Sequence, residues 1–493
     1  MAARGRVIHC RDLFWVRQVV GSDPVAPTNF IAIGIVIRDA HRSHSRAFRD
    51  TMKNPNIPRF TYFDLGPSGW PSAWRSAAGT ALLLALFLAL NCRSMTQVLH
   101  NSLPGHPNFW SAVGATLLLA ALIPLFALAR FSFGYIVGIA FFGLIAGFIW
   151  LTYFVGPAYD DVRARWSAAA SLLLFLLPVL FQTTRLPRAI VLSPRAMNRL
   201  LLLALGIAIA VLAWNSYYGF AVVGILEADQ LRGTFERPAL LRYLTPAVIG
   251  AVLPFAFAYF ACQRRYVVAA LSVLLIVCFY PVLLNKTVLL AGVWLPFLFL
   301  LFRTFEPKRA TVLALLIPMA VGLTAYVTVP AGNPVQQLAA YMFGFANYRM
   351  FAFPSLALDR YSDFFANHQL THFCQISLIR AIKGCPYAYQ LGAEMAERYH
   401  MGNLNASLFA TEGIASVGPI WAPASALVCG LVLSLGNSIS ARLSPCLIAV
   451  SSGLVVQALI NVPLSAAFLS NGLFALLLLW AVTPDPVVDG EGR

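Results

Sequence analysis

The sequence predicts an all-α membrane protein that crosses the bilayer many times. Hydrophobic residues make up 59% of the 493-residue chain and charged residues only 11%, whereas soluble domains carry about 25% charged residues. The mean hydropathy is +0.74. Apolar runs such as 77–92, 201–214 and 310–327 are long enough for helices that cross a hydrocarbon core ~30 Å thick. These runs lack the alternation of β-barrel strands, so helices must satisfy their backbone groups in lipid.

Hydrophobic windows place about 12 transmembrane helices along the chain. The predicted spans are roughly 77–92, 110–129, 132–155, 166–182, 200–224, 243–261, 266–281, 287–302, 310–329, 408–436, 444–461 and 463–482.

Basic residues decide the predicted orientation, because Lys and Arg are enriched in cytoplasmic loops. The connections 183–199, 262–265 and 303–309 are basic, as is the N-terminal tail. These segments and both termini are therefore predicted on the cytoplasmic side. The net charge of +16 follows this pattern, so we expect no nucleic acid among the partners. The outer side receives the connections 156–166, 227–242, 280–286 and 331–405.

The chain divides into five predicted regions. Residues 1–75 form a basic cytoplasmic tail without the apolar core of a signal peptide, and Met52 is an alternative start of translation. The other regions are helices 1–9 within 76–330, a long outer loop at 331–405, helices 10–12 within 406–482 and a cytoplasmic tail at 483–493.

The outer segment 331–405 is much longer than the other connections. Loops of that length are usually functional or disordered. This one is rich in aromatic and aliphatic residues and poor in charge, so disorder is disfavoured. We expect short amphipathic or re-entrant helices, broken at Pro354 and Pro386.

Cysteine usage gives no sign of a metal site. The eight cysteines are scattered and show no C-x-x-C spacing. Cys374 and Cys385 share the long outer loop, and they could pair if that side is oxidising; the sequence leaves this open.

Basic residues on the outer side run against the orientation rule and need a reason. Guanidinium groups bind phosphate in a bidentate way, and a lysine at a helix N-terminus reinforces an anion site. Any one of these residues has an alternative role, in pairing with a nearby carboxylate or with lipid headgroups. Together they predict an anion site made by Arg232, Arg237, Arg242, Lys286, Arg349 and Arg360.

Two pairs in the long loop have the spacing of one helical turn. His368 and His372 suit a general base or a hydrogen-bond partner for sugar, and no carboxylate lies between them as in a zinc motif. Ordinary interfacial histidines are the alternative. Asp359 and Asp363 form a competing acid/base pair.

The stretch 401–433 begins polar and becomes a membrane span. Asn403 and Asn405 are predicted to cap its helix. Glu412 lies about two turns in, where a carboxylate is costly unless it faces a polar cavity, so it is a functional candidate. A salt bridge to an outer arginine is the alternative.

The order of these features resembles the Wzy-type O-antigen and oligosaccharide repeat-unit polymerases. The resemblance covers roughly 200–440 and rests on "QLRGTFERPALLRYLTPAVIGAVLP", "NKTVLL", "YRMFAFPSLALDRYSDFF" and "NLNASLFATEGIASVG". It implies a glycosyltransferase of the bacterial inner membrane. Such enzymes join repeat units carried on undecaprenyl pyrophosphate at the periplasmic face, without a nucleotide sugar, metal or cofactor.

The resemblance also implies roles for the residues. Arg232, Arg242 and Lys286 would hold pyrophosphate, and Arg349 and Arg360 would stabilise charge on the leaving group. The general base stays open among His368, His372 and Asp363. Completing the predicted catalytic and substrate-binding residues are Glu412, Arg237, Tyr348, Tyr361, Asn403 and Asn405.

Three other classes compete with the polymerase. O-antigen ligases usually show a His-Asn pair before a glycine-containing stretch, but here four residues separate His400 from Asn405, so ligase ranks second. A flippase would place charges near the bilayer midplane, and the apolar runs are nearly free of them. A membrane acyltransferase would need a route for a cytoplasmic donor. Expected partners are the lipid bilayer, a chain-length regulator and a flippase.

Overall fold

The computed structural model describes residues 70–99, 107–156, 158–188, 190–224, 227, 231, 235–330, 333–401 and 403–485. The chain has two compact units, residues 1–75 and 76–493. Only the second is treated below, because the predicted tail at 1–75 lies outside the described residues apart from the first turns of one helix.

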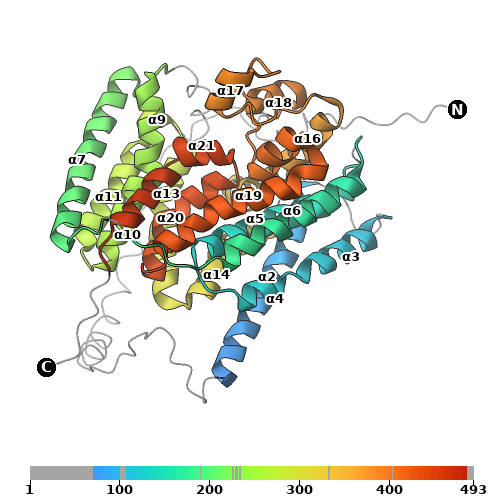
Figure 1. Ribbon diagram of the computed structural model, residues 1–493, viewed down its shortest axis with the longest axis horizontal. Coiled ribbons are helices and arrows are strands. Elements are labelled where there is room, and N and C mark those ends of the chain that lie inside the picture. Colours follow the sequence, from blue (N-terminus) through green and yellow to red (C-terminus); the bar gives the residue numbers. More distant parts are fainter. Residues whose placement is uncertain are drawn as a thin grey trace. The chain divides into compact units, whose positions relative to one another are not determined.

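Every regular element in the described part of the chain is a helix, which confirms the all-α prediction (Figure 1). In chain order the elements are α2 (Trp70–Val98), α3 (Phe109–Ala120), α4 (Ile123–Leu128), α5 (Phe133–Thr152), α6 (Asp161–Phe181), α7 (Pro194–Tyr218), α9 (Ala239–Ala247), η3 (Val248–Val252), α10 (Leu253–Cys262), α11 (Tyr266–Cys278), α12 (Tyr280–Leu283), α13 (Lys286–Thr304), α14 (Pro307–Thr328), α15 (Gln336–Phe343), η4 (Gly344–Ala352), α16 (Phe353–Asn367), α17 (Ser377–Lys383), α18 (Leu391–Tyr399), η5 (Phe409–Ala415), α19 (Ser416–Ser440), α20 (Pro445–Leu459), α21 (Leu464–Leu469) and α22 (Leu473–Val482). The η elements are π-helices.

Ten helical segments in the described residues are long and apolar enough to cross a membrane. Two further apolar helices, α20 and α22, are shorter. The protein is therefore a multi-pass membrane protein. The boundaries predicted for the long loop and the two tails stay predictions.

Two of the predicted spans are interrupted in the structure. The span predicted at 463–482 is divided into α21 and α22 where Gly472 adopts a φ of 89°. The span predicted at 408–436 bends at Gly418, whose φ is 76° and which Pro419 follows. Glycine tolerates this left-handed conformation at little cost. Hydrophobicity alone therefore does not predict the two interruptions.

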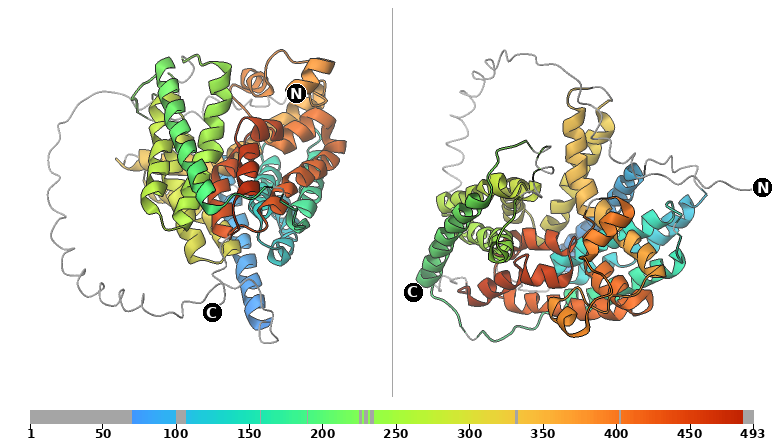
Figure 2. Two further views of the ribbon diagram at one scale, coloured as in Figure 1. Left: turned by 60° about the vertical axis from the view of Figure 1, so that its left-hand side comes forward. Right: turned by 90° about the horizontal axis from the view of Figure 1, so that it is seen from above.

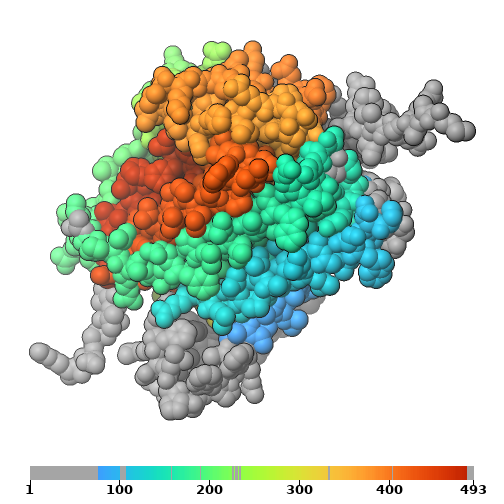
Figure 3. Space-filling view, turned by 45° about the vertical axis from the view of Figure 1, so that its right-hand side comes forward, coloured from blue at the N-terminus to red at the C-terminus, as the bar shows by residue number. Residues whose placement is uncertain are grey.

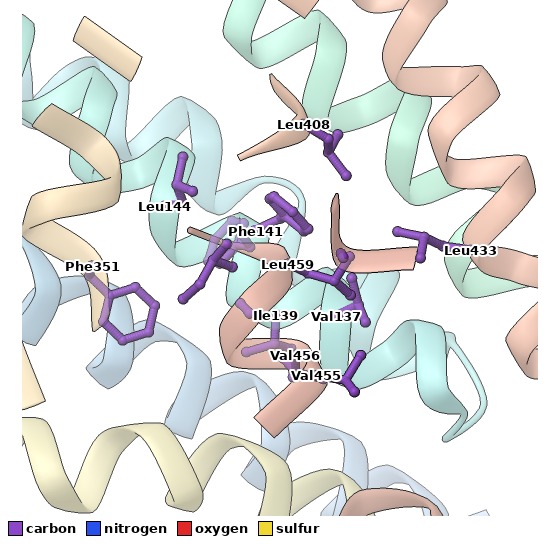
Figure 4. Close-up of a cluster of buried hydrophobic side chains, with 14 of the residues drawn as sticks. Val137, Ile139, Phe141, Leu144, Phe351, Leu408, Leu433, Val455, Val456 and Leu459 are labelled. Carbon is purple, nitrogen blue, oxygen red and sulfur yellow. The ribbon is translucent and has the colours of Figure 1, made fainter. Parts of the chain in front are cut away.

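Helix α5 is the centre of the bundle, and all but one of its residues are buried. Val137, Phe141 and Leu144 of this helix pack in a cluster with side chains of η4, α19 and α20 (Figure 4). Gly143 and Gly147 allow the close approach of a neighbouring helix, because a methyl group on either would collide with η4 or α16.

That neighbour is the first half of the segment predicted as a long loop. Elements α15, η4 and α16 follow one another without a gap from Gln336 to Asn367. Asn347 donates to Ser94 Oγ at 2.7 Å and to the Met319 carbonyl at 2.9 Å, and Ser355 donates to the Leu144 carbonyl at 2.8 Å. This half is therefore a helix fixed among the spanning helices.

The prediction that Pro354 breaks a helix is wrong. The residue lies in the first turn of α16, directly after the π-helix η4. A proline ring obstructs the preceding helical turn and removes a hydrogen-bond donor. The wider π turn accommodates both effects, so the backbone stays helical. Pro386 lies in the connection between α17 and α18, as predicted.

Alternate connections meet at opposite ends of the bundle. At one end Arg188 pairs with Asp485 at 3.0 Å, and Lys308 donates to the Ala127 carbonyl at 2.9 Å. At the other end Tyr159 reaches Asp359. Seen from above, α14 and α15 (yellow to gold) lie between α7 (green) and α3 (cyan) (Figure 2).

Candidate functional site

Titratable side chains gather at the C-terminal half of α16. This part of the helix, with α17 and α18, covers one end of the bundle beside α6 (Figure 3). The apolar face of α16 is buried against α5 and η5. We define the α16 cluster as Asp359, Arg360, Asp363, Tyr159 and Tyr399.

Asp359 is the buried member of the α16 cluster, with a relative exposure of 1%. Tyr159, in the connection between α5 and α6, donates a hydrogen bond to its Oδ1 at 2.7 Å. Arg360 Nη1 lies 3.6 Å from Oδ2. Burial raises the pKa of Asp359, against the opposing effects of Arg360 and Tyr159. Burial and the Asp359 charge raise the pKa of Tyr159, so its hydroxyl stays a donor.

Asp363 is one turn further along α16 and is half-buried. The hydroxyl of Tyr399, the last residue of α18, donates to its Oδ2 at 2.7 Å. Burial, followed by Asp363, raises the pKa of Tyr399. The Asp363 carboxylate is therefore oriented by a protonated phenol and keeps lone pairs for a second donor.

Arg360 pairs with Asp359 on one side, lies against the ring of Tyr399 and retains access to solvent. Its side chain is 24% exposed, and its guanidinium lies 5.5 Å from the centre of the Tyr399 ring. In the described part of the chain its Nε and the Oδ2 of Asp359 are buried without a hydrogen-bond partner. The exposed part of the Arg360 guanidinium is a donor that an anionic ligand could reach, whereas Asp359 Oδ2 could be satisfied only by a donor.

Tyr361 supports the cluster from behind and does not present its ring to a substrate. It is 1% exposed, and its hydroxyl donates to the Leu404 carbonyl at 3.3 Å. The prediction of Tyr361 as a substrate-binding residue is wrong for this reason. Burial, followed by the charge of Glu412, raises the pKa of Tyr361.

Glu412 is 5% exposed within η5. Its carboxylate accepts hydrogen bonds from Thr411 Oγ1 and, at 3.4 Å, from the backbone N–H of Ser465 at the start of α21. The predicted alternative, a salt bridge to an outer arginine, is not made among the described residues. A helix N-terminus stabilises a carboxylate instead.

A disulfide holds the segment after α16. Cys374 and Cys385 are bonded, which decides the pairing that the sequence left open. Thr371 in the same segment donates its backbone N–H to the Ala415 carbonyl at 2.8 Å, and Gln375 Nε2 donates to Ser416 Oγ at 2.9 Å. The segment is therefore fixed to the junction of η5 and α19.

The prediction that His368 and His372 share one helical turn is wrong. Helix α16 ends at Asn367, His368 is extended, and His372 has a φ of 49°. His368 stacks on Phe364 at 3.9 Å and its Nδ1 contacts the Phe364 carbonyl at 2.7 Å. Both side chains are exposed, and His368 is engaged with its own helix end.

Arg349 and Tyr348 belong to η4. Arg349 is exposed, and its guanidinium lies 4.8 Å from the centre of the Phe353 ring. Tyr348 is half-buried, with its ring 5.9 Å from that of Phe353. Both remain candidates for substrate contact.

A second basic group lies at the start of α9 and α13. Arg237 donates to the Val282 carbonyl of α12, Arg242 is exposed on α9, and Lys286 is the half-buried first residue of α13. Arg232 lies outside the described residues. Figure 1 shows α9 at the same end of the bundle as α17 and α18.

The capping role predicted for Asn403 and Asn405 is wrong. Element η5 begins at Phe409 and has no side-chain cap. Both asparagine side chains instead lie against Gly392 of α18, and Leu404 between them donates its N–H to the Gly392 carbonyl at 3.0 Å. The segment 403–405 therefore packs against α18 and does not cap η5.

Tyr159 and Tyr399 are the members of the α16 cluster that sequence reasoning missed. Tyr159 lies in the outer connection 156–166, next to Asp160 and Asp161. A tyrosine in a connection already assigned to the same side as α16 is a weak signal, and its partner is 200 residues away in sequence. Within the described residues, no three His, Cys, Asp or Glu side chains come together as a metal site requires.

No protein-family model, curated protein or solved structure matches the chain. What the α16 cluster does must be argued from its chemistry.

Proposed function

We propose that the protein polymerises lipid-linked oligosaccharide repeat units by glycosyl transfer at the periplasmic face of a bacterial inner membrane. The observation that carries the proposal is the α16 cluster at one end of a multi-pass bundle. In it a partly exposed arginine is paired with one hydrogen-bonded carboxylate and lies against the tyrosine that binds a second carboxylate. A cation beside a carboxylate is what transfer from a pyrophosphate leaving group needs.

In this proposal an acceptor sugar hydroxyl attacks the anomeric carbon of the donor. The new C–O bond forms as the bond from that carbon to the phosphate oxygen breaks, and undecaprenyl pyrophosphate leaves with the electron pair. Asp363 takes the hydroxyl proton, since Tyr399 fixes one of its oxygens and leaves the other open. Arg360 stabilises the leaving group, and Arg349 assists from η4.

Asp359 acts as a positioning residue. It is too buried to touch substrate, and with Tyr159 it holds the guanidinium of Arg360 from below. Tyr159 crosses from the connection after α5, so the position of Arg360 depends on the packing of α5 against α16. The exposed histidines carry no such support, and Asp363 is the proposed base.

The disulfide supports the proposed periplasmic location of the α16 cluster. Disulfides form in oxidising compartments such as the bacterial periplasm, and Cys374 and Cys385 lie on the same segment of the chain as the cluster. In the proposed orientation the basic connections and both termini lie on the cytoplasmic side.

The test is deletion of the gene in its host, followed by electrophoresis of the surface polysaccharide. A polymerase predicts loss of the long-chain ladder with a single repeat unit still attached. Complementation with Arg360→Lys or Asp363→Asn should fail to restore the ladder, whereas His372→Ala should restore it. An intact ladder in the deletion strain would refute the proposal.

O-antigen ligase is the second candidate, because it shares the donor and the leaving group and differs in acceptor. Loss of every repeat unit from the lipid core would identify a ligase or a flippase. Accumulation of donor on the cytoplasmic face would then single out the flippase.

A further inference from the structure

An apolar groove runs between α10, α11 and α13. Its volume is about 620 Å³, and Tyr266 is the single lining residue with a polar side-chain atom. Val293, which lines it, is 72% exposed, so the groove opens toward the surrounding bilayer. Water needs two to four polar partners to stay in a cavity, so hydrocarbon is the expected filling.

The groove follows the axis of α13. Its α13 wall extends from Leu289 to Phe299, which at 1.5 Å per residue is ~15 Å, about half of a hydrocarbon core. Small residues form part of its lining, among them Ala261 and Ala270. These dimensions suit one extended hydrocarbon chain that lies along the helices.

The outer end of the groove is basic. Lys286, Leu289 and Val293 are spaced i, i+3 and i+7 on α13, so Lys286 lies on the same face, above the groove. Arg237 lies in the connection before α9, and it donates to the carbonyl of Val282 in α12, four residues before Lys286. The N-terminus of α13 adds a partial positive charge.

We infer that this groove is the binding site for the polyprenyl tail of the lipid pyrophosphate that carries the acceptor sugar, with that pyrophosphate at Lys286 and Arg237 and apart from the donor pyrophosphate proposed at Arg360. The identity of the lipid rests on the proposed function. A pyrophosphate carries more charge than a phosphodiester and so gains more from a lysine, an arginine and a helix N-terminus together. A lipid with one hydrocarbon chain and one anionic head group fits an apolar groove that has a basic end.

A phospholipid of the opposite leaflet is the competing occupant. The inner end of the groove also carries a cation, because Arg303 lies 6.0 Å from the centre of the Phe299 ring. A phospholipid there would depend on Arg303, and the proposed lipid depends on Lys286. Substitution of these two residues therefore separates the occupants.

The experiment measures binding of polyprenyl pyrophosphate without sugar to the full-length protein in nanodiscs, with phosphatidylglycerol as competitor. Ala270→Trp and Val293→Trp fill the groove from its open side, where both residues are exposed. Each should raise the Kd at least tenfold. Val267→Trp is the matched control, since Val267 is 75% exposed on the same helix as Ala270 and does not line the groove.

The head-group arm uses Lys286→Gln, which should raise the Kd about tenfold, and Arg303→Gln, which should change it less than twofold. Equal binding by Ala270→Trp, Val293→Trp and Val267→Trp would overturn the inference. So would a larger effect of Arg303→Gln, or displacement by equimolar phosphatidylglycerol.

Because the probe carries no sugar, binding is independent of transfer. Groove-dependent binding in a protein whose deletion leaves the polysaccharide ladder intact would refute the proposed function and support the groove. A deletion that abolishes the ladder, together with binding that is unaffected by the groove substitutions, would support the proposed function and refute the groove.

Discussion

The hydrogen bond between Tyr159 and Asp359 should couple the connection after α5 to α16, and a double-mutant cycle measures that coupling. The O···O distance is 2.7 Å, in the range of bonds to a charged acceptor. Such a bond contributes about 1.5–3 kcal/mol, against about 0.5–1.5 kcal/mol for a neutral one. Tyr159 is half-buried, so we take about 2 kcal/mol for Tyr159→Phe.

With Asp359→Asn in place, the amide oxygen still accepts from Tyr159 but carries no charge. Tyr159→Phe should then cost about 1 kcal/mol, which leaves a coupling energy of about 1 kcal/mol. The assay is the free energy of unfolding from denaturant titration in detergent at pH 8. Tyr218→Phe is the control, since Tyr218 is a half-buried tyrosine on α7, and it should be additive with Asp359→Asn within about 0.4 kcal/mol. A coupling energy between Tyr159 and Asp359 as small as that of the control would refute the charged bond.

Three further predictions concern the charge of Asp359, the disulfide and the close approach at Gly143. Because burial raises the pKa of Asp359, the stability it contributes is full below its unfolded pKa of about 4 and falls as pH rises through the folded value. The free energy of unfolding of the wild type minus that of Asp359→Asn should therefore decrease between pH 4.5 and 8, and a constant difference would contradict the shift. Replacing Cys374 and Cys385 by alanine opens a loop with a sequence separation of 11 and should cost up to about 3 kcal/mol, with faster hydrogen exchange at 368–385. Cys278→Ala, at an exposed free cysteine, should leave that exchange unchanged, and equal exchange in both proteins would exclude a role for the disulfide. Gly143→Ala places a methyl group 2.6 Å from Phe351 and should cost about 1–3 kcal/mol, whereas Gly114→Ala meets nothing within 4 Å and should be neutral or stabilising in thermal unfolding.

The fold class was predictable because lipid restricts the choice of structure. A chain so apolar must satisfy its backbone groups within helices, and the basic connections alternate as the orientation rule requires. The interruptions at Gly418 and Gly472 were not predictable, because a glycine in an apolar run signals nothing until its backbone angle is known.

The candidate site was predictable in its residue types and less so in its partners. Arg360 and Asp363 are polar residues of the segment that sequence reasoning singled out, and Asp359 and Asp363, spaced i, i+4, do lie on one helix. The same spacing failed for His368 and His372, because α16 ends between the pairs. An i, i+4 spacing predicts a shared face only where the helix continues. The residues after Asp363 contain no strong signal that the helix ends at Asn367.

The geometry of the α16 cluster favours a functional origin over a stabilising one. Asp359 and Arg360 are neighbours in sequence, and adjacent side chains on a helix do not face each other, which explains why they are 3.6 Å apart and lack a bidentate bond. A pair selected for stability would use i, i+4 spacing and would satisfy its buried atoms. Here Asp359 Oδ2 and Arg360 Nε are left unsatisfied within the described residues, at a cost of about 1–3 kcal/mol each. The protein retains this energetic cost at one end of the bundle, while its membrane spans exclude charge. In return the guanidinium of Arg360 stays partly exposed. An anionic substrate is the ligand that such a group would bind.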